Sequence, residues 1–293
     1  MPPRVQGAMN DGAMRRYVVN LVRQIIAARG LALRPGWREA VAALGLPPVR
    51  FRELSDGTDG MCVDRQIVIS TRLVCPERVE FTVFHEVLHI LIDEDEDWEI
   101  GAQLRGFSGS LDERGRQRVL EQLCQAGAAE FVVPAEPFTA LMGRHGWQIS
   151  ALAEAVTVFG CSSIAAAFQF AHCYPDPCVV VICEDGVPPQ PGHARGSGSP
   201  SGCRCLHVAY SVGNFKNKYP MCRHVTVPRS HLIHQAWRDA APVSGTDIGF
   251  FRDNRTWKMD CEVACLKRRA YALFLTQGRT TQTYNSSQQT FAW

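Results

Sequence analysis

The chain has 293 residues, with 46% hydrophobic and 20% charged residues and a formal net charge of +2. This composition is typical of a folded protein with one or two cores. It excludes an intrinsically disordered chain, and the small net charge does not indicate a nucleic-acid partner. The most apolar early stretch, residues 14–28, contains Arg15, Arg16 and Arg23, so it fits neither a signal peptide nor a membrane span. We therefore expect a cytoplasmic protein with no membrane partner and with reduced cysteines.

The first half of the chain is expected to be mostly helical. Apolar residues recur at helical spacing in four segments, and Gly30 and Gly45 stand where helix caps would lie. The predicted helices span residues 14–28, 37–44, 76–92 and 110–131. Between them, β-branched residues favour two strands of a small sheet, at residues 48–54 and 62–70. Residues 1–12 are expected to form a flexible tail.

The second half changes in character after residue 174. Before that point, residues 150–172 predict two short helices separated by Gly160, and this pattern resembles a helix-turn-helix pair. After it, a stretch rich in proline, glycine and serine interrupts several strand-like segments. The predicted strands are 179–183, 206–211, 223–227, 262–266 and 271–276, and residues 230–239 are predicted to be helical.

The helix predicted over residues 76–92 carries an H-E-x-x-H motif, His85-Glu86-Val87-Leu88-His89. Residues four apart lie on one helix face, so both imidazoles can bind one tetrahedral Zn²⁺ ion. Glu86 projects beside them and can act as the general base toward a water molecule that the metal activates. The alternative is an ordinary helix whose two histidines match a five-residue pattern by chance.

A catalytic zinc ion needs a third protein ligand. The longer metzincin motif is absent, because Ile92 and Asp95 stand where its glycine and its third histidine would be. Our candidate is Glu121, which lies on the next long helix, on a face that can turn toward the histidines. Glu130 lies two and a half turns further along and cannot share that face, so we expect it to be structural or to orient a metal ligand without binding the metal.

Two segments resemble the signatures of a known family. The H-E-V-L-H motif preceded by Glu80-Phe81-Thr82, and E-x-x-C-x-x-x-A-A-E-F-V-V-P at residues 121–134, are similar to those of the ImmA/IrrE family of bacterial metallopeptidases. Departures from the family's usual residues at positions 80, 88 and 125 remove no ligand. The site residues that the resemblance implies are the zinc ligands His85, His89 and Glu121 and the catalytic Glu86.

The resemblance also implies an α+β fold in three parts: a zincin-like metallopeptidase domain, a helix-turn-helix-like connector, and a C-terminal GAF/PAS-like sensor domain. The expected bounds are 13–146, 147–174 and 175–277, with a polar tail over 278–293. The implied activity is cleavage of one specific protein, typically a helix-turn-helix repressor in stress response or mobile-element control. A small molecule could bind the C-terminal domain. The alternative is a non-proteolytic regulator that binds a repressor or a small ligand and holds a structural zinc.

Two weaker patterns have simpler interpretations. Residues 147–190 contain no lysine or arginine, although phosphate contacts dominate DNA affinity, so we expect no direct DNA binding by the helix pair. Potential metal ligands also alternate along two predicted strands, but the same alternation is typical of half-buried strands. These residues are Cys203, Cys205, His207, Cys222 and His224.

Overall fold

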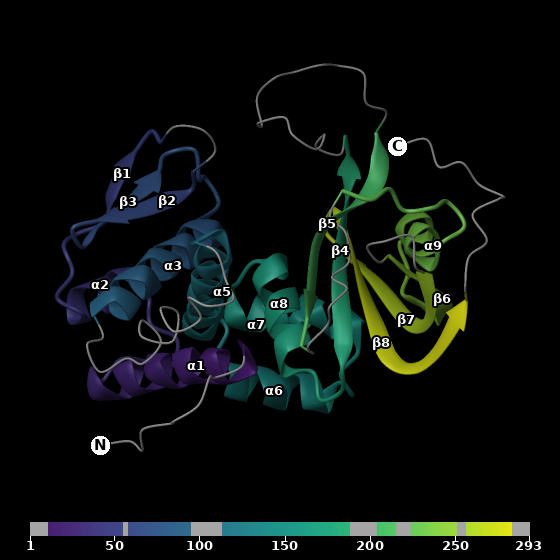
Figure 1. Cartoon of the computed structure of the whole chain (residues 1–293), viewed down its shortest axis with the longest axis horizontal. Helices are drawn as coiled ribbons and strands as arrows, with labels where there is room; N and C mark the ends of the chain where they lie inside the picture. Colours follow the sequence, from purple (N-terminus) through teal and green to yellow (C-terminus); the bar gives the residue numbers. More distant parts are fainter. Residues whose placement is uncertain are drawn as a thin grey trace. The chain divides into compact units, whose positions relative to one another are not determined.

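The computed structural model describes residues 11–54, 58–94, 113–187, 204–214, 224–250 and 256–282. The chain divides into two compact units, Met1–Pro134 and Ala135–Trp293. Figure 1 shows helices and a small sheet in the first unit, and a larger sheet with helices in the second. This mixture of helices and largely antiparallel sheets confirms the α+β class.

All four helices predicted for the first half of the chain are present in the described residues of the first unit. Its elements are α1 (Asp11–Ala28), α2 (Trp37–Ala43), β1 (Arg50–Arg52), β2 (Gly60–Val63), β3 (Gln66–Ser70), α3 (Pro76–Glu94) and α5 (Glu113–Val132). One prediction was wrong: residues 62–70 are not a single strand. Asp64 and Arg65 adopt positive φ angles of 48° and 65° and form the two-residue turn of a hairpin between β2 and β3.

The small sheet has the order β1-β3-β2, with β1 parallel and β2 antiparallel to β3. Its inner face packs on α3, where Ile67 and Ile69 of β3 join Val83 and Val87 of α3 in one buried core. β2 is an edge of this sheet and lies beside α3. The hairpin therefore brings a strand edge next to the helix that carries the H-E-x-x-H motif.

Helix α3, which carries the H-E-x-x-H motif, and helix α5, which carries Glu121, pack closely together. This packing sets the distance between the candidate ligands. Phe84 of α3 stacks on Phe131 of α5, with ring centroids 4.5 Å apart and planes 6° from parallel. Gly127 of α5 permits the close approach, because a Cβ atom there would lie 2.7 Å from Leu88 Cγ and 2.8 Å from Val18 Cγ1. Glycine weakens a helix on its own. Here the neighbouring side chains of α3 and α1 require it.

An ion pair joins α1 to α5. The guanidinium Nε of Arg23 lies 2.7 Å from Oε1 of Glu130, whose side chain is 2% exposed. A buried carboxylate is tolerated only when it is paired or hydrogen-bonded. This contact agrees with the structural role expected for Glu130.

The second unit is a five-stranded antiparallel sheet with helices packed on it. Its elements are α6 (Ala135–Arg144), the 3₁₀ helix η2 (Ile149–Ala151), α7 (Leu152–Phe159), α8 (Ser163–Cys173), β4 (Cys178–Gly186), β5 (Cys205–Gly213), α9 (Leu232–Asp239), β6 (Val243–Phe250), β7 (Thr256–Leu266) and β8 (Arg269–Gln282). The strand order is β5-β4-β8-β7-β6. Helix α9 packs on β6, β7 and β8, and its Ile233 and Ala236 complete the core of one sheet face. Helix α8 packs on β4 and β5.

Three elements of this unit differ from expectation. The strand predicted over 223–227 was wrong for its described part, where Thr226 forms only an isolated bridge with His207. Helix α6 and strand β6 were not anticipated, because Gly143, Ser244 and Gly245 dilute their apolar patterns. Helix α6 also falls in the second unit, whereas the expected metallopeptidase domain reached residue 146. The division into three domains remains a prediction.

The helix pair predicted over 150–172 is present as η2, α7 and α8. Ile149–Phe159 and Ser163–Cys173 meet at 120°, and Ser162 caps α8 by accepting a hydrogen bond from the backbone N–H of Ala165. Within the described ranges, no single helix is long and apolar enough to cross a membrane, and this bent pair passes that test only as a pair, by length and composition.

Candidate metal centre

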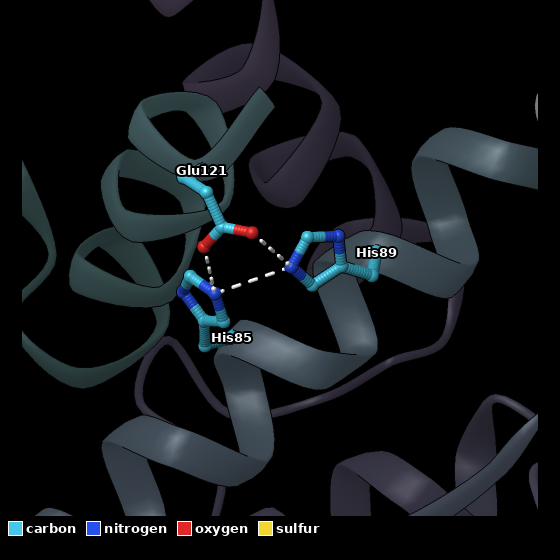
Figure 2. A group of neighbouring side chains, drawn as sticks. All are labelled: His85, His89 and Glu121. Carbon is cyan, nitrogen blue, oxygen red and sulfur yellow. Dashed lines mark hydrogen bonds and ion pairs between the residues drawn. The ribbon is translucent and has the colours of Figure 1, made fainter. Parts of the chain in front are cut away.

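His85 and His89 stand one helical turn apart on α3, and both side chains are half-buried. Their imidazole Nε2 atoms lie 3.2 Å from each other. The opposite face of α3 is fixed by the core beneath the small sheet, and Phe84 and Leu88 are held against α5. This packing leaves the two histidines directed together toward α5, as Figure 2 shows.

Glu121 reaches the histidines from α5 (Figure 2). Its Oε2 lies 3.1 Å from Nε2 of His85, and its Oε1 lies 3.5 Å from Nε2 of His89. One turn earlier on α5, the side-chain amide of Gln117 donates a 2.9 Å hydrogen bond to Oε1 of Glu121. The carboxylate is therefore held at the histidines by a neighbour on its own helix.

The donor set and its spacing fit a tetrahedral metal ion. The three ligand atoms lie within 4.8 Å of one another, and in the described part of the chain no other group of three His, Cys, Asp or Glu side chains meets that condition. Zinc bonds of about 2.0–2.1 Å at tetrahedral angles place neighbouring ligand atoms about 3.4 Å apart. The contacts between the three residues are 3.1–3.5 Å, with Glu121 approaching His85 through Oε2 and His89 through Oε1. Two imidazoles and one carboxylate form a catalytic set that leaves one position for water or substrate.

The protonation states also suit metal binding. The hydrogen bond from His85 is the main cause that lowers the pKa of Glu121, so this carboxylate is charged at neutral pH. Burial, followed by the neighbouring His85, lowers the pKa of His89 and favours the neutral imidazole. A charged carboxylate and a neutral imidazole are the forms that bind metals.

Glu86 lies next to His85 but outside the ligand triad, and it is 6% exposed. Burial is the main cause that raises the pKa of its carboxyl; the charge of Glu121 raises it further, and His85 partly opposes both. A carboxylate whose pKa is shifted toward neutrality is suited to act as a general base. The structure thus brings all four predicted site residues to one place, on α3 and α5.

The second group of potential ligands does not assemble in the described residues. Cys205 lies 3.5 Å from the hydroxyl of Thr226, and His207 Nδ1 contacts the carbonyl oxygen of Cys205. His224 is exposed. Cys203 and Cys222 lie outside the described residues.

Sequence reasoning missed three residues around the site. Gln117 could have been found, because it precedes Glu121 by one helical turn. Gly60 and Cys62 reach Glu86 from β2, and a single sequence carries no signal for that approach. It depends on how the hairpin packs on α3.

Comparison with known proteins relates this chain to metallopeptidases. Residues 45–170 match the family model described as Peptidase_M78, the IrrE N-terminal-like domain. The chain is 26% identical to the radiation response metalloprotease IrrE of Deinococcus radiodurans over 241 residues, covering 81% of this chain and 71% of that protein. It is also 26% identical to the protein of the same name from Deinococcus deserti over 240 residues, covering 76% and 82%.

A solved structure shares the fold. The structure of a Mycobacterium tuberculosis transcriptional regulator superposes with a TM-score of 0.53 at 13% sequence identity. The match covers 90% of this chain and 80% of that one. At this identity the likeness concerns the fold alone.

Proposed function

Because this chain is a metallopeptidase of the ImmA/IrrE family, we propose that it is a zinc-dependent endopeptidase with ligands His85, His89 and Glu121 and general base Glu86. The observation that carries the proposal is the convergence of His85, His89 and Glu121 beside a buried glutamate: the two imidazole Nε2 atoms lie 3.2 Å apart, and each carboxylate oxygen of Glu121 lies 3.1–3.5 Å from one of them. The chemistry of the donor set favours zinc over harder metals, which prefer oxygen ligands.

The chain's own residues then have distinct tasks. A zinc ion bound here would polarise the scissile carbonyl and lower the pKa of water toward about 7. Glu86 accepts a proton from the attacking water at its carboxylate and passes it to the departing amine. Its raised pKa suits both transfers. Gln117 keeps the Glu121 carboxylate oriented by its hydrogen bond.

The position of β2 supports a polypeptide substrate. In the described residues β2 pairs with β3 on one side only, so its other side is a free strand edge, and Gly60 of this strand lies close to Glu86. An extended peptide can pair with such an edge by strand addition. This arrangement would place a backbone segment, rather than a small molecule, beside the general base.

We further propose a helix-turn-helix transcriptional repressor as the substrate, in stress response or mobile-element control. The family resemblance supports this substrate, and the names of the two Deinococcus relatives support the stress response. For residues 175–277, within the second unit, we propose a GAF/PAS-like sensor domain that binds a small ligand, with which the antiparallel sheet and the covering helix α9 are compatible. A cytoplasmic location and the absence of direct DNA binding remain predictions.

The test is to compare bacterial cells that produce the wild type or the Glu86→Gln variant, before and after stress. New protein N-termini are mapped by chemical labelling and mass spectrometry, and each cleavage is then repeated with purified, zinc-loaded protein. We expect a repressor fragment with the wild type alone. Equal release of the target promoter by Glu86→Gln, without cleavage, would replace the enzyme by a non-proteolytic regulator.

A further inference from the structure

Two residues of β2 face the general base. Along this strand Gly60 and Cys62 are half-buried, whereas Met61 and Val63 are exposed. Gly60 pairs with Ile69 and Cys62 with Ile67, which point into the core under α3. Paired residues of neighbouring strands project to the same sheet face. Gly60 and Cys62 therefore point toward α3.

Gly60 lets the Glu86 carboxylate lie against the strand. A Cβ atom at position 60 would stand 3.1 Å from Oε1 of Glu86 and 2.6 Å from Cγ2 of Thr82. Glycine within a strand often marks a point where another group approaches the backbone closely. The carboxylate is thus enclosed by β2 on this side, which accounts for its low exposure.

Cys62 supplies a hydrogen bond in that enclosure. Its thiol S–H donates to the Glu86 carboxylate, and its side chain also packs against the core under α3. Burial, followed by the charge and the hydrogen bond of Glu86, raises the pKa of this thiol to about 11, so it keeps its proton at neutral pH. A buried carboxylate needs such a partner, because hydrogen bonds offset its loss of water.

We propose that Cys62 is a positioning residue for the general base: its thiol fixes the Glu86 carboxylate in one orientation beside the metal ligands. The inference rests on the proposed function and names a residue that acts through Glu86 rather than on the substrate. The glutamate side chain has three rotatable bonds, and loss of this contact would let the carboxylate leave the orientation that accepts the proton. Binding of metal and substrate would be unaffected.

The first experiment measures the contact without any catalysis. In the metal-free protein, the rate of alkylation of each cysteine by iodoacetamide is followed by mass spectrometry in the wild type and in Glu86→Gln. We expect Cys62 to react severalfold faster in the variant, because its thiol ionises more easily without the neighbouring charge. Cys75, an exposed thiol 2.8 Å from Glu77 Oε2, is the control and should not change. An unchanged rate at Cys62 would overturn the inference.

The second experiment measures catalysis with a fluorogenic peptide that spans the bond cleaved in the substrate search. We expect Cys62→Ala to lower kcat about tenfold, with KM and zinc content within about twofold of wild type. Cys62→Ser should recover most of the rate, because a hydroxyl can donate the same bond. The control Cys75→Ala removes a thiol–carboxylate contact at the surface and should leave kcat unchanged.

The outcomes separate the two proposals. If the wild type cleaves the peptide and Cys62→Ala has the same kcat, the positioning role is wrong and the peptidase stands. The role is also wrong if Cys62→Ala loses zinc in parallel with activity, since the residue would then be structural. A wild type that cleaves nothing, although Cys62 responds to Glu86→Gln, would remove the proposed function while the contact remains.

Discussion

Replacement of Gly127 by alanine tests whether helix packing sets the ligand spacing. On an open helix, Gly→Ala stabilises by about 1 kcal/mol. At position 127 the new methyl group would stand 2.7 Å from Leu88 Cγ and 2.8 Å from Val18 Cγ1. Leu88 Cγ is a branch point that cannot turn aside, and overpacking of this kind costs about 1–3 kcal/mol. We therefore expect Gly127→Ala to be less stable than wild type by about 1–2 kcal/mol, despite the gain in helix propensity.

The same substitution should also change the positions of the metal ligands and weaken zinc binding. Relief of the clash separates α5 from α3 by a few tenths of an ångström, and Glu121 moves away from His85 and His89. Residues that orient ligands change metal affinity by about 10–100-fold, so we expect zinc affinity to fall about tenfold. The assays are urea unfolding of the metal-free protein and competition for zinc with a chromogenic chelator.

Gly143→Ala is the matched control. Gly143 also lies in a helix, α6, but a Cβ atom there would meet nothing within 4 Å. This variant should be as stable as wild type or more stable by up to about 1 kcal/mol, with unchanged zinc affinity. If Gly127→Ala behaved like Gly143→Ala in both assays, the close approach of α3 and α5 would not be what positions Glu121.

Three further predictions concern ion pairing, pH and metal. Arg23→Ala should lower stability by about 2–3 kcal/mol in urea unfolding, because it removes a charged partner from the buried carboxylate of Glu130. By contrast, Arg65→Ala breaks an exposed pair with Glu94 and should cost at most about 1 kcal/mol. His231 Nδ1 caps α9 by accepting from Ile233 N–H, and burial lowers the pKa of His231 below its ordinary 6.5. The neutral form is therefore favoured by folding, so melting temperature should fall as pH drops below about 6.5, and His231→Asn should flatten that slope. Finally, removal of zinc by a chelator should lower the melting temperature, since free zinc at about 100 times its Kd adds about 2.7 kcal/mol; an unchanged temperature would contradict a bound metal.

Local patterns in the sequence were sufficient to predict the helices of the first unit and the candidate site residues. Four-residue spacing on one helix fixes the relation of His85 to His89 in any fold. Glu121 was found because a helix face has a definite direction, and the face that holds it does turn toward α3. In both cases the geometry of a single helix was sufficient for the prediction.

Tertiary contacts account for what was missed. The hairpin turn at Asp64-Arg65 has no glycine or asparagine, so it gave no turn signal, and its positive φ angles are tolerated within the packed sheet. Glycine inside a helix ordinarily weakens it, so the sequence alone gives no sign that the contact with Leu88 requires Gly127. The approach of Cys62 to Glu86 likewise depends on residues distant in sequence.

The central claim is a zinc site built from three protein ligands, and the most direct test is the metal content of purified protein. Wild type, Glu86→Gln and Glu121→Ala are supplied with zinc, dialysed and analysed by mass spectrometry for metal. We predict about one zinc ion per chain in wild type and in Glu86→Gln, and a marked loss in Glu121→Ala. A wild type that holds no zinc, or a Glu121→Ala variant that holds as much as wild type, would contradict the account.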